Sequence, residues 1–215
     1  MDKNYYIKNR LEIVDFLPDS YRTVLEIGCG DGNFRKNLDN GCEYWGIEPN
    51  NEAFNIARLI LDKAYLGTYD DVFNEIPNKY FDLIVCNDVI EHMYEYEHFM
   101  STIKEKLKAG GCIIGSIPNV RYFPNLMNFL IKKNWEYEES GILDKTHVRF
   151  FTEKSLKKEF KKYGYKIEMI EGINGFKPCG IGLNNIINYM KYQIKILIFG
   201  KDVEYMQFGF RVIPI

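Results

Sequence analysis

The stretch that decides the fold reads Val24-Leu25-Glu26-Ile27-Gly28-Cys29-Gly30-Asp31-Gly32-Asn33-Phe34. It begins as a short apolar run and stops at three glycines in alternate positions, after which residues 33–40 have the pattern of a helix. Glycines suit such a place because a tight turn needs positive φ and because a ligand can approach a bare backbone closely. The start of the helix would offer unpaired amide groups to that ligand. The stretch therefore predicts a strand, a ligand-binding loop and a helix.

The same stretch indicates which ligand the loop binds. A dinucleotide site prefers the spacing G-x-G-x-x-G, whose third glycine would fall at position 33, where this chain has Asn33. Glu26 lies just inside the strand, where a carboxylate would repel a pyrophosphate but attract an ammonium group. These two features favour S-adenosylmethionine over NAD.

A second carboxylate follows at the end of the next predicted strand. Glu48 lies 18 residues beyond Gly30, and Pro49-Asn50 closes the strand after it. A carboxylate in this position can accept hydrogen bonds from both hydroxyls of a ribose. The alternative is an exposed charge at a strand end. Because Glu48 follows a glycine loop at this spacing, we favour the ribose contact.

Strand-like and helix-like runs alternate through the first two thirds of the chain. Beyond the first strand and helix, we predict strands over 43–48, 65–66, 81–86 and 112–117, and helices over 52–63 and 96–108, the last helix ending at Ala109-Gly110-Gly111. This rhythm predicts βαβ units, a mainly parallel sheet and helices on both of its faces. We therefore expect an α/β, doubly wound, Rossmann-like fold.

The pattern loosens after Pro118. There we predict helices over 126–131, 152–163 and 183–199, and strands over 165–171 and 205–213. Residues 1–215 are expected to form a single domain, with residues 119–150 as an insertion or cap over the edge of the sheet where ligands bind. The apolar stretch 184–199 is expected to be a buried core helix rather than one that touches a membrane or a second subunit.

The composition of the chain limits which partners and which cellular compartment we expect. The 215 residues carry 28 basic and 30 acidic side chains, a net charge of −2, which provides no basic field for nucleic acid. Five cysteines without C-x-x-C spacing predict reduced thiols, and the polar stretch Met1 to Arg10 lacks an apolar signal core, so we expect a cytoplasmic protein. No apolar run is long enough for stable membrane insertion. We expect a monomer or homodimer, and we find no pattern of metal ligands in the sequence.

Four successive motifs resemble those of class I S-adenosylmethionine-dependent methyltransferases: VLEIGCGDGNF, GIEPN, FDLIVCNDVIEHM and LKAGGCIIGSIPN. The resemblance covers roughly residues 20–120, with the motifs in the family's order and spacing. It implies a sheet of seven strands whose last strand is antiparallel. Its implied cofactor contacts fall on these residues: Gly28, Gly30, Gly32 and Glu26 around the methionine moiety, Glu48 and Pro49 at the ribose, Asn87 and Asp88 at the sulfonium end, and either Thr68 or Asp70 at the adenine.

The candidate bases for methyl transfer are few, because the chain has three histidines. His92 follows Glu91 at the entrance to the predicted site, and its alternative is a structural histidine bonded to nearby backbone. His98 lies in a charged helix and is expected to be exposed. His147 stands between Asp144 and Arg149, a set that either orients a base and binds substrate or ties the insertion to the sheet.

A second resemblance concerns the possible acceptor. Tyr5-Tyr6, Arg10 and the run Gly141-Ile142-Leu143-Asp144-x-Thr146-His147-x-Arg149-Phe150-Phe151-Thr152 are similar to a bacterial methyltransferase group associated with glycosyltransferases and surface polysaccharides. The resemblance implies O-methylation of a saccharide or sugar nucleotide, with Tyr6 and Arg10 either in a lid over the cofactor or in surface packing. The alternatives are another small acceptor, such as a phenol or quinone precursor, and a non-catalytic protein that keeps the cofactor fold.

Overall fold

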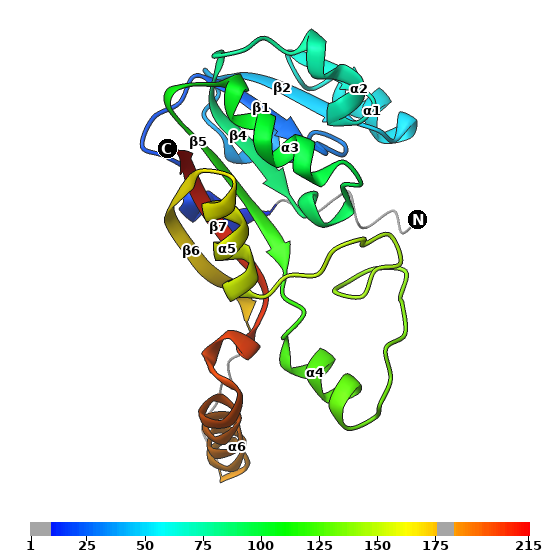
Figure 1. The fold of residues 1–215 in the computed structure, drawn as a ribbon, viewed down its shortest axis with the longest axis vertical. Coiled ribbons are helices and arrows are strands. Elements are labelled where there is room, and N and C mark those ends of the chain that lie inside the picture. The colour runs from blue at the N-terminus through cyan, green and yellow to red at the C-terminus, as the bar shows by residue number, and fades with distance from the viewer. Residues whose placement is uncertain (1–9, 176–182) are drawn as a thin grey trace.

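The computed structural model describes residues 10–175 and 183–215, and the first feature it shows is one seven-stranded sheet (Figure 1). The strand order is β3-β2-β1-β4-β5-β7-β6. The strands are β1 Thr23–Ile27, β2 Glu43–Glu48, β3 Lys63–Leu66, β4 Phe81–Asn87, β5 Leu107–Pro118, β6 Tyr165–Gly175 and β7 Tyr205–Pro214. The α-helices are α1 Asn51–Ala57, α2 Tyr69–Val72, α3 Tyr96–Thr102, α4 Phe123–Leu130, α5 Glu153–Lys162 and α6 Leu183–Phe199.

The pairing of the strands confirms the predicted topology. Strands β1 to β5 pair in parallel, whereas β7 runs antiparallel to both β5 and β6. The strand order changes direction at β1, where the chain crosses from β3 back to β4. Ligands of open α/β sheets bind at such a point, beyond the carboxyl ends of the strands. The glycine loop leaves β1 at this point.

The sheet is covered on both faces, as predicted. Alternate residues of β1 and β4 enter two separate apolar clusters: Leu25 and Ile84 join one, and Val24 and Leu83 join the other. The first cluster includes buried residues of α2, α3 and α5, and the second includes residues of α1 and of the 3-10 helix Leu11–Phe16. Strands buried on both faces explain the continuous apolar run of β4.

Two predicted helices are shorter than the sequence pattern indicates. Residues 33–40 form only a 3-10 helix, Asn33–Asn37, because the Arg35 guanidinium bonds the carbonyls of Asp39 and Cys42 and turns the chain toward β2. Helix α1 ends at Ala57 rather than at residue 63, because Asp62 already pairs with the β2 residue Tyr44.

The prediction that a helix ends at the glycines of residues 109–111 is also wrong. Helix α3 ends at Thr102, a 3-10 turn continues to Lys106, and the glycines lie inside β5. There the pairing with β4 shifts register, and Gly110 has φ of +82°. The glycines therefore serve an irregularity of the strand rather than the end of a helix.

Helices α4 and α6 extend away from the sheet (Figure 1). Helix α4 lies past the end of β5, and α6 projects as an arm on which Leu197 is 86% exposed. The prediction of a buried core helix at 184–199 is therefore wrong, because both faces of the sheet are already covered by other helices. No helix in the described part of the chain has the length and apolar character needed to span a bilayer. The four cysteines in that part are buried and unbridged.

Candidate functional site

The backbone of the glycine loop has torsion angles that residues with a side chain rarely adopt. Gly28, Gly30 and Gly32 have φ of +67°, +53° and +75°. A Cβ on Gly28 would lie 2.5 Å from Cγ2 of Val89, and one on Gly32 would lie 3.2 Å from the Leu61 side chain. Conformation therefore favours glycine at all three positions, and packing also favours it at Gly28 and Gly32.

The loop is fastened to the end of β2. The amides of Gly28 and Cys29 donate to the carbonyl of Ile47 at 2.8 and 3.0 Å, and the amide of Gly30 donates to Oε2 of Glu48 at 2.8 Å. Backbone atoms and one buried carboxylate thus fix the shape of the cradle. A cradle of this form, bare of side chains, fits the close approach of a methionine moiety.

Glu48 is buried at the rim of this cradle. Its Oε1 accepts the Asn50 amide at 2.8 Å, so each carboxylate oxygen holds one backbone amide and retains a further lone pair. Burial raises the pKa of Glu48, and these two amide bonds oppose the rise. The intervening Pro49 is exposed. The arrangement suits acceptance of ribose hydroxyls, and the ribose contact stays a prediction.

Glu26 is buried beneath the loop rather than exposed to solvent. The Tyr44 hydroxyl donates to its carboxylate. Burial raises the pKa of Glu26 to about 8, while the Tyr44 hydrogen bond and the charge of Arg10 act in the opposite direction. A cationic group brought near Glu26 would favour the ionised carboxylate. The ammonium contact stays a prediction.

Asn87 and Asp88 follow β4 but differ in their surroundings. The side chain of Asn87 makes no hydrogen bond of ordinary length among the described residues, but it lies close enough to Glu26 to help lower the pKa of that carboxyl. Asp88 has positive φ and is paired with Arg10. It also accepts hydrogen bonds from the Ser116 hydroxyl at 2.6 Å and from the Gln207 amide at 2.5 Å. Asn87 is therefore the better placed of the two to contact a ligand.

Sequence reasoning missed the Ser116 and Gln207 contacts. Ser116 pairs with Asn87 across β4 and β5. A correct alignment of these two predicted strands would therefore have placed Ser116 at the site. Gln207 lies on β7 opposite Pro118. Arg10, predicted as part of a lid or of surface packing, instead ion-pairs with Asp88 in this network and with Glu12. Tyr6 lies outside the described residues.

The two adenine candidates have different partners. The Thr68 side chain caps α2 in a reciprocal capping box with Asp71. Oδ1 of Asp70 lies 2.5 Å from Nδ1 of His98. His98, which is 43% exposed, is therefore paired rather than a bare surface histidine. The choice between Thr68 and Asp70 at the adenine stays a prediction.

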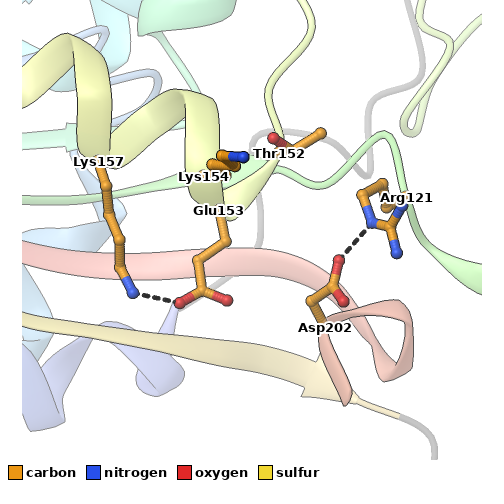
Figure 2. Close-up of a pocket in the computed structure, with 6 residues that line it drawn as sticks. All are labelled: Arg121, Thr152, Glu153, Lys154, Lys157 and Asp202. Carbon is orange, nitrogen blue, oxygen red and sulfur yellow. Dashed lines mark hydrogen bonds and ion pairs between the residues drawn. The ribbon is translucent and has the colours of Figure 1, made fainter. Parts of the chain in front are cut away.

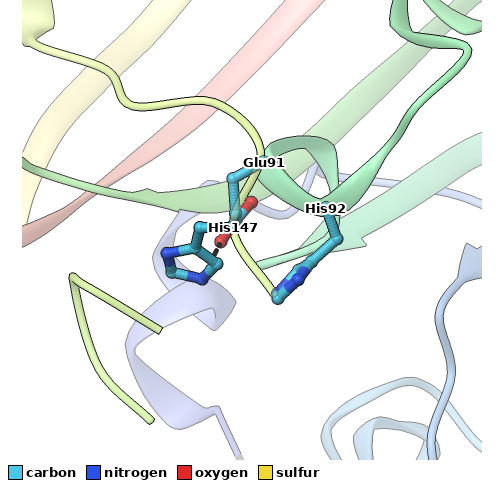
Figure 3. A group of neighbouring side chains, drawn as sticks. All are labelled: Glu91, His92 and His147. Carbon is cyan, nitrogen blue, oxygen red and sulfur yellow. Dashed lines mark ion pairs between the residues drawn. The ribbon is translucent and has the colours of Figure 1, made fainter. Parts of the chain in front are cut away.

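Glu91, His92 and His147 form a compact group, called the Glu–His cluster below (Figure 3). The imidazole rings of His92 and His147 lie 4.6 Å apart, and Nε2 of His147 lies 3.9 Å from Oε1 of Glu91. Glu91 is 1% exposed, and burial raises its pKa well above the ordinary value. Burial also lowers the pKa of His92, as does the nearby His147. Sequence reasoning missed Glu91, although an acid beside a histidine in an otherwise apolar turn is a detectable signal.

The Asp144, His147 and Arg149 set does not assemble as a unit. Asp144 accepts the amide and hydroxyl of Thr146 at 2.7 and 2.6 Å, so it does not hold the imidazole of His147. Arg149 donates to the Met93 carbonyl. The acid beside His147 is Glu91, because the amides of residues 148 and 149 bond the Glu91 carbonyl and draw this segment onto it. Arg149 therefore ties the insertion down.

A separate hollow of about 610 Å³ lies between α5, the end of β5 and the turn before β7 (Figure 2). Its lining residues are Arg121, Thr152, Glu153, Lys154, Lys157 and Asp202. Arg121 pairs with Asp202 at 2.6 Å, and Lys157 pairs with Glu153 at 2.5 Å. No residue of the glycine loop or the Glu–His cluster lines it. We assign it no role in the site.

Comparison with known proteins identifies the family. A family model described as a methyltransferase domain matches residues 2–170. A mitochondrial ubiquinone biosynthesis O-methyltransferase of Rattus norvegicus is 25% identical over 169 residues, which cover 73% of this chain and 48% of that protein. The ubiquinone biosynthesis O-methyltransferase of Paraburkholderia phymatum is 26% identical over 182 residues, which cover 79% of this chain and 76% of that protein. The chain spans about half the length of the first curated relatives it matches.

Solved structures show the same fold. A SAM-dependent methyltransferase of Archaeoglobus fulgidus has a TM-score of 0.66 at 20% identity, covering 98% of this chain and 94% of its own. A possible histamine N-methyltransferase of Thermotoga maritima has a TM-score of 0.62 at 19% identity, covering 97% and 88%. The chain therefore belongs to the methyltransferase-domain family, and it has the fold of S-adenosylmethionine-dependent methyltransferases.

Proposed function

We propose that this methyltransferase transfers a methyl group to a hydroxyl of a small, ring-bearing acceptor held at the Glu–His cluster. The observation that carries the proposal is the contact between Gly28 and Val89, which joins the cofactor cradle to the turn containing Glu91 and His92. S-adenosylmethionine supplies a methyl group already activated by its sulfonium. The protein has to align the acceptor and remove its proton.

His147 is the proposed base. Its Nδ1 lies 3.0 Å from the Ile142 carbonyl, and because a carbonyl can only accept, Nδ1 carries the proton. Nε2 of the neutral ring therefore presents a lone pair inside the cluster. His92 is the alternative base, and its Nδ1 faces the hydroxyl and carbonyl of Thr146.

An aromatic wall supports a ring-bearing acceptor. Phe129, Trp135 and Tyr137 are exposed, and ring contacts of 5.5 to 6.4 Å connect them through Phe150 to His147. All five rings lie within residues 119–150, which agrees with the proposed role of this segment as a cap. Together with the O-methyltransferases among the relatives, this wall favours a phenol or quinone precursor.

A saccharide or sugar nucleotide is the second candidate. It rests on the resemblance of residues 141–152 to the glycosyltransferase-associated group. Catechols, other phenols, sugar nucleotides and free saccharides, each offered with S-adenosylmethionine and read by a mass gain of one methyl group, would separate the two classes. Methylation of sugars alone would overturn the phenolic proposal.

The base is tested with His147→Ala. We expect turnover to fall by about 10²- to 10⁴-fold, the usual contribution of a positioned base, with affinity for S-adenosylhomocysteine unchanged. Glu52→Ala is the control, because this exposed glutamate at the start of α1 lies outside the cluster. Equal losses of turnover and cofactor affinity, or no loss of either, would contradict the assignment.

A further inference from the structure

Helix α6 is attached to the rest of the protein along one of its faces. The Tyr192 hydroxyl donates to the buried carboxylate of Glu204, in the turn before β7. The centroid of the Phe199 ring lies 5.8 Å from that of Phe123 in α4, and Nζ of Lys195 lies 4.9 Å from the centroid of the same Phe123 ring. Tyr192, Lys195 and Phe199 are spaced i, i+3 and i+7, so they share one face of the helix. This face packs against the protein.

The opposite face of α6 is apolar and open to solvent. Its members are Met190, Ile194, Leu197 and Ile198, all of them exposed. Their spacing of i, i+4, i+7 and i+8 makes a single apolar stripe. The stripe lies on a helix that projects away from the sheet (Figure 1). Exposed apolar side chains are common singly, but a contiguous set of them on a projecting element indicates a binding surface.

The charge of this region has one sign. Residues 172–201 contain four lysines and no acidic residue, although the whole chain has 30 acidic and 28 basic side chains. Lys191 is exposed beside the apolar stripe. The next two acids along the chain do not offset this charge, because Asp202 pairs with Arg121 and Glu204 is buried. The partner of the stripe should therefore be both apolar and negatively charged.

We propose that α6 binds the surface of an anionic lipid bilayer and lies along that surface. An interfacial helix places its apolar face among the acyl chains and its lysines near the headgroup phosphates. Helix α6 has the apolar stripe and the lysines, and it lacks the apolar length that crossing a bilayer requires. Pairing of two copies through α6 would instead bring identical lysines together, which is unfavourable. The inference goes beyond the proposed function and does not depend on it.

Vesicle binding by the full chain tests the apolar stripe. The protein is sedimented with vesicles of phosphatidylcholine and phosphatidylglycerol in equal parts, or of phosphatidylcholine alone. We expect binding to the anionic vesicles that weakens with added salt, since salt screens exposed charges. Leu197→Glu replaces an apolar contact with an acid, so partition onto these vesicles should fall by about 10-fold or more. Leu59→Glu is the matched control, because Leu59 is similarly exposed and lies outside α6.

A second pair of variants tests the charge. A lysine near an anionic surface contributes about fivefold to binding, so Lys191→Gln should lower partition by about that factor. Lys166→Gln, which changes an exposed lysine of β6, removes the same charge away from the stripe and should bind as the unchanged protein does. Circular dichroism shows that each variant is folded.

Three results would overturn the inference: no partition of the folded protein onto anionic vesicles, equal partition of Leu197→Glu and Leu59→Glu, or equal partition onto the two kinds of vesicle. Light scattering identifies the other occupant of the stripe. A dimer that Leu197→Glu dissociates, in a protein that binds no vesicles, would show that α6 contacts a second copy of the chain and that the lipid proposal is wrong.

Discussion

The proposed cofactor side of the site, residues 26–50, and the proposed acceptor side, the Glu–His cluster, are built in different ways. On the cofactor side, consecutive elements β1 and β2 supply the cradle and its carboxylates, and most fixing bonds run from backbone amides. On the acceptor side, segments 54 residues apart meet through the bonds of Thr146 to His92. Backbone geometry dominates one side, and side-chain chemistry dominates the other.

Because of this difference, the two sides should tolerate substitutions to different extents. A cradle made by backbone tolerates few substitutions, because its shape depends on positive φ and on close packing against Val89. The proposed acceptor side depends on residues 119–150, which lie mostly outside helices and strands, and the contacts of such segments vary more readily than those of a sheet. Changes on the cofactor side should therefore weaken ligand binding, whereas changes on the acceptor side should alter turnover alone.

The largest effect is expected from Glu48→Ala. Hydrogen bonds to a charged group contribute about 1.5–3 kcal/mol each, so loss of two ribose contacts should weaken S-adenosylhomocysteine binding by about 100-fold or more. Calorimetric titration measures it. The control is Glu52→Ala, an exposed glutamate at the start of α1. If Glu48→Ala binds like the control, the ribose contact is wrong.

Gly28→Ala tests the backbone itself. Positive φ costs an L-residue about 1–2 kcal/mol, and the new Cβ would also displace Val89, so cofactor affinity should fall by about 30-fold. Gly41→Ala is the matched control, because a Cβ there meets nothing within 4 Å. Similar affinities of the two variants would show that the cradle is not the binding surface.

Proton release on binding tests Glu26. Its pKa is raised to about 8 by burial, so the carboxyl is protonated below that pH in the ligand-free protein. A ligand ammonium would favour the carboxylate, so binding should release a proton and strengthen as the pH rises toward 8. We expect about a tenfold gain in S-adenosylhomocysteine affinity between about pH 6 and pH 8. Calorimetry in buffers of different ionisation enthalpy counts the protons, and Glu26→Gln should remove the effect.

The same contrast explains how much could be predicted from sequence. The alternating strands and helices and the role of glycine at three positions follow from local patterns, because period, apolar runs and turn chemistry act over short distances. The number of strands and the antiparallel last strand came instead from the resemblance to class I methyltransferases. Helix ends were less predictable. Arg35 and Asp62 stop helices early through bonds to other elements, which no local pattern reveals.

The acceptor side was predicted only in part. His92 and His147 were recognised as candidates, but Asp144 was paired with His147 in place of Glu91. Closeness in sequence was a poor guide because a turn directs Asp144 to Thr146, while docking of residues 148 and 149 on Glu91 brings His147 to that acid. Long-range contact therefore decides the chemistry on this side.

The smallest effect is expected from Thr146→Val, which tests the acceptor side alone. The change removes the hydroxyl that receives the Nδ1 proton of His92 and keeps the volume similar. A hydrogen bond of this kind contributes about 0.5–1.5 kcal/mol, so turnover should fall by about two- to tenfold while S-adenosylhomocysteine affinity stays the same. Thr102→Val is the control, since that hydroxyl bonds the His98 carbonyl outside the cluster. Weaker cofactor binding by Thr146→Val would mean that the two sides are coupled, and that the separation of backbone cradle from side-chain chemistry does not hold.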